Sequence, residues 1–253
     1  MDQARRARVS VEVSGVAKTF GVGAAAVTAL RDIDLKVGHG EFVCLLGASG
    51  CGKSTLLNLL AGLDSPTSGT VDVAAARPSF MFQDAALMPW LTAARNVELA
   101  LQLAGQGRAE RRERAAELLS LVRLDGVGDK RPHELSGGMR QRVSLARALA
   151  AATASTEHGE PGLLLMDEPF AALDAITRDV LQGELLRVWE ATGTTVVFVT
   201  HDVREAVRLA QRVVLLSSRP GTVVREWTVA EHGPELHDEI TGRLRQVISA
   251  HAA

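Results

Sequence analysis

The sequence predicts an α/β fold organised around a P-loop, and two observations carry that prediction. A glycine-rich stretch at residues 47–55 lies between an apolar, strand-like run at 41–46 and a helical pattern at 56–61. Further along, apolar runs alternate with helical patterns at about 175–192 and 202–210, and these runs are residues 163–166, 195–200 and 213–216. Apolar strands that alternate with helices are typical of a parallel sheet with helices on both faces.

An antiparallel β layer is expected before the P-loop. Residues 9–13 and 32–37 alternate apolar and polar side chains, and the second run ends at Gly38-His39-Gly40. Such alternation predicts strands with one buried face. After the P-loop helix, Gly62 ends the periodicity and residues 64–69 have the composition of a turn. Short strands are expected at 70–73 and 79–82.

A helical region is expected from about residue 91 to residue 124. Ala115, Leu118, Leu119 and Val122 form an apolar face, and the arginines and glutamates of residues 108–117 are expected to be solvated. Residues 150–159, rich in Ala, Ser, Thr, Glu and Gly, are expected to form an exposed loop. The tail, residues 222–253, predicts a strand followed by an amphipathic helix.

Composition narrows the possible function classes. The 253 residues contain 28 Lys and Arg against 30 Asp and Glu, a net charge of −2, so the chain has no overall electrostatic footprint for nucleic acid. No run approaches the roughly 18 apolar residues that span a bilayer, and residues 1–8 lack the apolar segment of a signal peptide, so a cytoplasmic protein is expected. Two cysteines, Cys44 and Cys51, imply no disulfide framework. Cys51 is either a reactive thiol, favoured by Lys53 and the helix N-terminus, or an inert loop residue.

The P-loop residues are suited to binding a nucleoside triphosphate. Glycines let consecutive backbone N–H groups turn inward around phosphates, and the following helix offers its N-terminal dipole. Lys53 is expected to reach the β- and γ-phosphates, Ser54 to ligate Mg²⁺, and Thr55 to add a phosphate contact. The expected nucleotide-binding residues here are Gly47, Ala48, Ser49, Gly50, Cys51, Gly52, Lys53, Ser54 and Thr55.

Two carboxylates follow the apolar run at 163–166. Asp167 and Glu168 stand where open α/β sheets place their ligand groups, at the carboxyl end of a strand. One carboxylate can hold Mg²⁺ through water, and its neighbour can polarise the water that attacks the γ-phosphate. We assign the first role to Asp167 and the second to Glu168.

A third motif, about thirty residues before this pair, resembles the signature motif of ABC ATPases: Leu135-Ser136-Gly137-Gly138-Met139-Arg140-Gln141-Arg142. Ser136 is a good N-cap, and the two glycines leave N–H groups and a helix dipole facing an anion. In that family the motif reaches across a head-to-tail dimer to the γ-phosphate held by the other subunit. The resemblance therefore implies a homodimer that encloses two ATP molecules, with Ser136, Gly138 and Asp174 at its interface.

Other positions fit the same family. Gln83 resembles the Q-loop glutamine that contacts Mg²⁺ and the attacking water, Ala171-Ala172-Leu173-Asp174 resembles the D-loop, and His201 resembles the switch histidine. Phe20 stands where many relatives stack a tyrosine on adenine, and Val27 is expected beside the nucleotide. The chain departs from the family at Met139, commonly glutamine, and at Ala171, commonly serine.

The resemblance implies the ATP-hydrolysing subunit of an ABC transporter, with ATP and Mg²⁺ as cofactors. Residues 82–90 and 217–221 resemble the importer subgroup for aliphatic sulfonates, taurine and nitrate. The implied partners are membrane permease subunits and, indirectly, an extracytoplasmic solute-binding protein, with the chain peripheral at the cytoplasmic face of the membrane. An exporter ATPase or an importer of another small solute is the alternative. A P-loop kinase would not need the signature, and 83–136 is too short for the coiled-coil arms of a DNA-repair ATPase.

The expected organisation is one ABC ATPase domain at 9–229, with a helical subdomain at about 88–150, and a helical tail at 230–253. Within residues 87–90 the apolar cluster Leu-Met-Pro-Trp follows the nucleotide-sensing Gln83. Trp90 either packs inside the helical subdomain or faces a partner and couples it to the ATP state.

Overall fold

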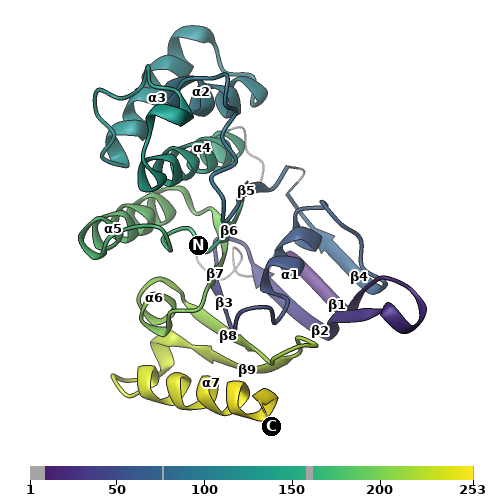
Figure 1. The fold of residues 1–253 in the computed structure, drawn as a ribbon. Helices are drawn as coiled ribbons and strands as arrows, with labels where there is room; N and C mark the ends of the chain where they lie inside the picture. The colour runs from purple at the N-terminus through teal and green to yellow at the C-terminus, as the bar shows by residue number, and fades with distance from the viewer. Residues whose placement is uncertain (1–8, 76, 158–161, 253) are drawn as a thin grey trace. The chain divides into compact units, whose positions relative to one another are not determined.

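The computed structural model describes residues 9–75, 77–157 and 162–252 (Figure 1). These residues form two compact units. The first joins the described parts of Met1–Ala76 and Thr195–Ala253, and the second is Arg77–Thr194.

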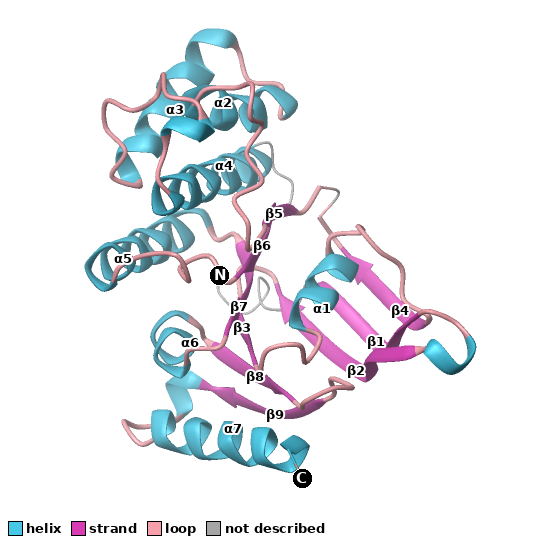
Figure 2. Ribbon diagram, in the orientation of Figure 1, coloured by secondary structure: helices cyan, strands magenta, loops and turns pink. Residues whose placement is uncertain are grey.

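An antiparallel sheet occupies the N-terminal part of the first unit. Its strands are β1 (Val9–Phe20), β2 (Val27–Gly38) and β4 (Ser68–Val73), in the order β2-β1-β4, and Figure 2 shows them side by side. Val13 lies opposite Leu35 on one side and Val71 on the other. β1 continues well beyond the predicted residues 9–13, because register shifts and Gly15, with φ of +54°, let the strand bend and keep pairing. A short 3₁₀ turn, Gly23–Ala25, connects β1 to β2.

A second set of strands in this unit carries the P-loop. β3 (Phe42–Leu46) pairs in parallel with β7 (Thr195–Thr200) and β8 (Arg212–Leu216), and β9 (Val223–Thr228) pairs antiparallel with β8. Every residue of β3 and β7 is buried, as their continuous apolar sequences predict. Helix α1 (Lys53–Leu60) follows β3, and α6 (Val203–Leu209) connects β7 to β8.

The C-terminal helix α7 (Leu236–Ala252) completes the first unit after a 3₁₀ turn, Val229–Glu231. Leu236 and Ile240 are buried. The indole Nε1 of buried Trp227, on β9, donates a hydrogen bond to Glu239 Oε1 over 2.9 Å. Arg225 pairs with the same oxygen over 2.8 Å, so α7 is attached to β9 by both polar and apolar contacts.

The second unit is mainly helical. It contains the parallel strands β5 (Ser79–Met81) and β6 (Leu163–Asp167) and the helices α2 (Ala93–Leu103), α3 (Arg108–Leu121), α4 (Gly137–Glu157) and α5 (Ala175–Thr192), with a 3₁₀ turn at Pro132–Glu134. The helical pattern expected from 91 to 124 is thus two helices. Gly105, with φ of +90°, ends the first of them.

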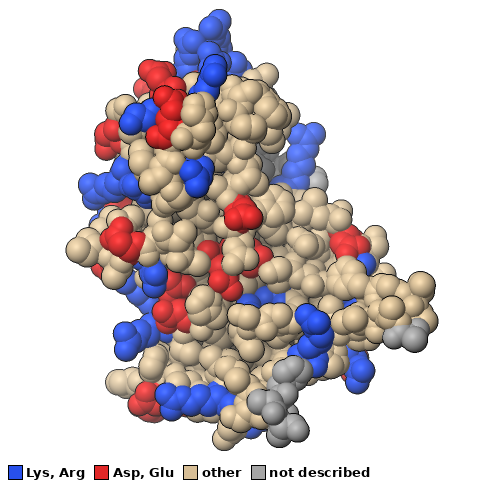
Figure 3. All heavy atoms as spheres, in the orientation of Figure 1, with Lys and Arg blue, Asp and Glu red and all other residues tan. Residues whose placement is uncertain are grey.

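The apolar face expected on α3 is present, since Ala115, Leu118, Leu119 and Val122 are all buried. Basic and acidic side chains over α2 and α3 are interspersed (Figure 3). Arg111 differs from the expected solvated face, because its Nε lies 3.7 Å from the carboxylate of buried Glu98 on α2.

The prediction of an exposed loop at 150–159 is wrong for residues 150–157, which the structure describes. Helix α4 continues to Glu157, and Ala150, Ala152 and Ala154 are buried. Alanine has the highest helix propensity, and the buried hydroxyl of Thr153 is satisfied because its Oγ1 donates to Leu149 O over 2.8 Å. Residues 158–161 lie outside the described residues.

Candidate functional site: a phosphate-binding loop

The P-loop fills the connection between β3 and α1, and its glycines are required by sterics. A Cβ on Gly47 would lie 2.8 Å from Cys51 Sγ and 3.2 Å from Leu216 O. A Cβ on Gly52 would lie 2.6 Å from Leu30 Cδ2, and φ of Gly52 is +104°. The backbone can therefore make this tight turn only without side chains at 47 and 52.

The Lys53 side chain folds back onto the preceding P-loop and is held there by hydrogen bonds. Lys53 is buried, and its Nζ donates to the carbonyl oxygens of Gly47 and Ala48, each over 2.8 Å. Lys53 is also the first residue of α1, so its ammonium group and the helix dipole place positive charge at the same point. Ser54 is exposed in the first turn of α1 and Thr55 is partly exposed, which leaves both hydroxyls near the loop.

The two cysteines of the first unit are buried. Cys51 Sγ lies 3.8 Å from Lys53 Nζ. Burial in apolar surroundings raises the pKa of the Cys44 thiol, with a further contribution from Glu205. Cys44 is therefore held in the neutral, inert form.

Phe20 and Val27 face each other across the end of the β1–β2 hairpin. They are register partners, and their side chains are 45% and 43% exposed. Lys18 Nζ lies 5.0 Å from the centre of the Phe20 ring and is held by Asp64 over 2.6 Å. The pair presents an exposed apolar surface of the kind on which an aromatic base can stack.

His201 follows β7 at the sheet edge where the P-loop begins. Leu46, the last residue of β3, lies opposite Thr200, so Gly47 and His201 leave the sheet at the same edge. His201 is exposed. The backbone around it is fixed, since Thr200 Oγ1 donates to buried Glu205 over 2.6 Å and accepts from the N–H of Asp202 over 3.0 Å.

In the second unit, Gln83, Asp167 and Glu168 lie at the carboxyl ends of the neighbouring parallel strands β5 and β6. Met81 and Met166 are register partners at the ends of β5 and β6, and all three site residues follow closely. Asp167 is buried and Gln83 is exposed. Glu168 has a left-handed backbone, with φ of +46°, which is uncommon for a residue with a side chain and typical of functional turns.

The signature residues form the start of α4. Ser136 Oγ accepts a hydrogen bond from Met139 N–H over 3.2 Å, as an N-cap does. A Cβ on Gly138 would meet Leu173 Cδ2 at 3.5 Å, an ordinary contact, and one on Gly137 would approach Arg140 only to 3.8 Å. The packing of this chain therefore does not require glycine at either position.

Asp174 begins α5 in the same unit. Its carboxylate accepts a hydrogen bond from Thr177 N–H over 2.9 Å, and that bond lowers its pKa. Asp174 is exposed and ionised at the helix N-terminus.

Sequence reasoning missed two contacts between the turn after β8 and the P-loop. Arg219 Nε donates to Gly50 O over 3.3 Å, and Gly221 packs directly on the Cys51 peptide. No local pattern could have revealed the first contact, because 169 residues separate Arg219 from Gly50.

The span that holds the P-loop, Gln83, residues 135–142 and the Asp167–Glu168 pair matches one known protein family. A family model described as "ABC transporter" matches residues 30–171, more than half of the chain. The chain belongs to the ABC transporter family. The expected α/β P-loop fold of an ABC-type ATPase and the expected ATPase class are therefore confirmed.

Relatives of this ABC cassette include transport proteins from several bacteria. The taurine import ATP-binding protein TauB of Burkholderia pseudomallei strain K96243 is 52% identical over 206 residues, which cover 79% of this chain and 76% of TauB. The nitrate import ATP-binding protein NrtD of Synechocystis sp. is 44% identical over 232 residues, 89% of this chain and 84% of NrtD.

A solved structure of similar fold is the dimeric, post-hydrolysis ATP-binding cassette MJ0796 with ADP and Pi bound. It is 36% identical, has a TM-score of 0.77, and the match covers 88% of this chain and 99% of that one. Within the described residues of the present cassette, no helix is long and apolar enough to cross a membrane.

Proposed function

We propose that this ABC cassette is the ATP-hydrolysing subunit of an importer for a small anionic solute, such as taurine, another aliphatic sulfonate or nitrate. The observation that carries the ATPase part is the P-loop geometry, in which Lys53 and the start of α1 concentrate positive charge beside glycines that admit no side chain. The importer part is supported by the relatives TauB and NrtD, whose names both specify import of small solutes.

ATP would bind first to the first unit. Phe20 and Val27 offer the surface for adenine, while the backbone N–H groups of residues 47–55 and the Lys53 ammonium hold the phosphates.

Mg²⁺ prefers oxygen ligands and uses one or two protein groups together with phosphate oxygens. The Ser54 hydroxyl, the Gln83 amide oxygen and the Asp167 carboxylate fit that donor set. In the described part of the chain, no three His, Cys, Asp or Glu side chains gather into a metal site.

Hydrolysis is assigned to three residues. Glu168 polarises the attacking water, Gln83 contacts that water, and His201 contacts the γ-phosphate. His201 suits this role because it leaves the sheet at the edge where the P-loop begins, on a backbone fixed by Thr200 and Asp202.

The start of α4 is assigned to a second copy of the chain. A Cβ on Gly137 would have no neighbour closer than the Arg140 guanidinium at 3.8 Å, so an anion held by the partner has room to approach the helix N-terminus closely. Ser136, Gly138 and Asp174 would then lie at the interface of an ATP-bound homodimer. The dimeric form of MJ0796 supports this arrangement.

A permease is the expected membrane partner, and Trp90 is the expected contact. Its side chain is 69% exposed, which favours the partner-facing interpretation over packing inside the helical part. The backbone beneath it is rigid, because buried Asn96 accepts from Met88 N–H over 2.8 Å and donates to Thr92 O over 3.0 Å. The cassette would be peripheral at the cytoplasmic face, and a solute-binding protein would act through the permease.

The test is growth and uptake in a strain that lacks this chain. Loss of uptake of one anionic solute, restored by the wild-type gene and not by Lys53→Ala, supports the proposal. Unchanged uptake of every such anion, with intracellular accumulation of a compound that is normally exported, would favour the exporter alternative.

A further inference from the structure

The turn after β8, residues 217–222, is fixed by its own hydrogen bonds. Ser217 Oγ accepts from Thr222 N–H over 2.8 Å and donates to Pro220 O over 2.9 Å, and the backbone of Ser217 donates to Thr222 O over 2.9 Å. Ser218 Oγ also donates to Val247 O of α7 over 3.2 Å. These hydrogen bonds hold the conformation of the turn and attach it to the C-terminal helix.

This turn lies at the sheet edge that carries the P-loop. Leu46 of β3 and Leu215 of β8 are register partners, so the connections after both strands leave at the same edge. Gly221 is bonded to β2, since its N–H donates to Ala29 O over 2.8 Å and its carbonyl accepts from Arg31 N–H over 2.9 Å. The turn is thus held between β2 and the P-loop.

Two contacts connect the turn to the central peptides of the P-loop. A Cβ on Gly221 would lie only 2.2 Å from Cys51 O, so the glycine backbone itself rests on that carbonyl. Arg219 Nε donates to Gly50 O over 3.3 Å. The two contacts reach the carbonyl oxygens of consecutive residues, Gly50 and Cys51. Both residues are expected to contact the phosphates.

The Arg219 contact fixes the orientation of one peptide. The carbonyl and the N–H of a trans peptide point in opposite directions, so a donor on Gly50 O turns the Cys51 N–H to the other side. That N–H donates to Ala48 O over 3.3 Å, so bonds at both ends of the peptide hold the turn of the loop at residues 48–51. Gly50, with φ of +76°, is otherwise the kind of residue at which the loop would move most freely.

We propose that Arg219 is a positioning residue for nucleotide binding, which holds the Gly50–Cys51 peptide and with it the turn of the P-loop on which the phosphates are expected to bind. This inference rests on the proposed binding of ATP at the P-loop. Ordering the loop before the ligand arrives lowers the entropic cost of binding, so the effect falls on ATP affinity.

The experiment compares Arg219→Ala, Arg219→Lys and Arg243→Ala in ATP binding and in steady-state hydrolysis. Arg243, on α7, is the matched control because its guanidinium bonds only to Gln246 among the described contacts, over 2.8 Å at an exposed site. Because the Arg219 bond is also exposed, Arg219→Ala should weaken ATP binding and raise KM about three- to tenfold, with kcat within about twofold. Arg219→Lys, which keeps a charged donor, should restore most of the affinity, and Arg243→Ala should behave like the wild type.

An Arg219→Ala protein that binds ATP as tightly as Arg243→Ala would overturn the inference. A loss that Arg219→Lys does not restore, and that is matched by a fall in melting temperature, would overturn it too. Lys53→Ala separates this failure from that of the proposed function. If Lys53→Ala binds ATP normally, ATP does not bind at the P-loop; if only Arg219→Ala binds normally, the positioning role alone is wrong.

Discussion

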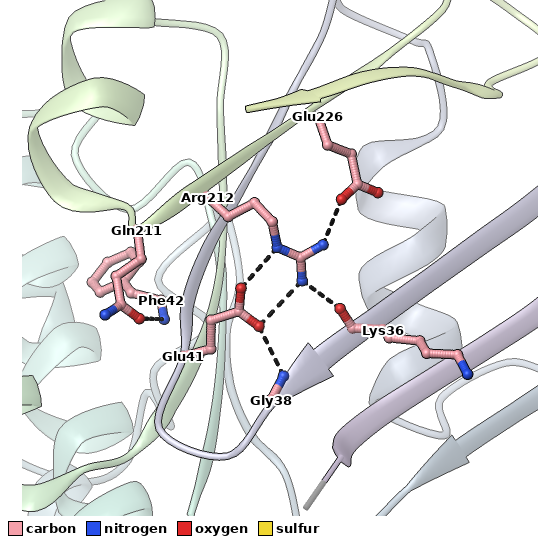
Figure 4. Close-up of polar contacts among 7 residues, drawn as sticks. All are labelled: Lys36, Gly38, Glu41, Phe42, Gln211, Arg212 and Glu226. Carbon is pink, nitrogen blue, oxygen red and sulfur yellow. Dashed lines mark hydrogen bonds and ion pairs between the residues drawn. The ribbon is translucent and has the colours of Figure 1, made fainter. Parts of the chain in front are cut away.

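The Arg212 guanidinium donates to both carboxylate oxygens of Glu41, over 2.7 and 3.1 Å, across 171 residues of sequence (Figure 4). The same guanidinium reaches Glu226 on β9 over 2.6 Å and the Lys36 carbonyl on β2, and Glu41 also accepts from Gly38 N–H over 2.8 Å. Burial lowers the pKa of Arg212, but the bonds to Glu41 and Glu226 outweigh that effect and leave the pKa raised. Arg212, on β8, thus connects β8 to β2 and β9 and, through Glu41, to the start of β3. The opposite ends of β3 and β8 lead into the P-loop and into the turn at residues 217–222.

Arg212→Met should destabilise the first unit, because the partly buried Glu41 carboxylate loses both guanidinium donors and keeps the N–H of Gly38. The pairs are partly exposed, so the expected loss is about 1–3 kcal/mol, below that of a fully buried pair. Urea unfolding followed by circular dichroism measures it. Lys36→Met is the control, since its ammonium is exposed and pairs with Glu12 at the surface. Equal losses in the two variants would show that the network contributes no more than a surface ion pair.

Gly221→Ala should weaken ATP binding by more than about tenfold. The added methyl must displace Cys51 O, which would lie 2.2 Å away, so the P-loop has to move. Equilibrium binding of a fluorescent ATP analogue measures the loss. Gly242→Ala is the matched substitution, because nothing lies within 4 Å of its Cβ position in α7. It should keep full affinity and stabilise the helix by up to about 1 kcal/mol. Normal affinity in Gly221→Ala would contradict the close contact.

Trp90→Ala should uncouple ATP hydrolysis from transport. The side chain is exposed, so its loss leaves the isolated cassette folded and hydrolysing ATP, while permease-dependent uptake falls. Hydrolysis and uptake are compared in membranes that contain the permease. Leu103→Ala, at a similarly exposed position at the end of α2 (68%), controls for loss of surface apolar area. Intact transport in Trp90→Ala would exclude a permease contact through this residue.

The attachment of α7 should weaken in acid through Glu239. The hydrogen bond from Trp227, together with the charges of Arg225 and His232, lowers the pKa of this carboxyl below its ordinary 4.5. A lowered pKa in the folded state means that the ionised group stabilises the fold above pH 4.5, and that this contribution is lost as the pH falls through the lowered value. Hydrogen exchange of α7 amides should therefore be slower in the wild type than in Glu239→Gln at neutral pH, and the difference should disappear in acid. A difference that is independent of pH would exclude ionisation as the cause.

The local parts of the fold and site were predictable, and the long-range parts were not. The P-loop, the apolar strands β3, β6 and β7, and the strand-end position of Asp167 each follow from neighbouring residues. The extent of α4 was missed because the composition of residues 150–159 resembles that of a loop, while burial of alanines against the rest of the unit is a tertiary effect. The contacts of Arg212 with Glu41 and of Arg219 with Gly50 join residues far apart in the sequence, and no periodicity reports such pairs.

The central claim, that Glu168 and the signature residues act in an ATP-bound homodimer, is tested most directly by size-exclusion chromatography of Glu168→Gln with and without Mg-ATP. Lys53→Ala serves as the variant that does not bind ATP. We expect Glu168→Gln to form a dimer only with Mg-ATP, because ATP closes the interface at Ser136 and hydrolysis can no longer reopen it, and we expect Lys53→Ala to remain a monomer. A Glu168→Gln protein that binds Mg-ATP and still elutes as a monomer would contradict the account.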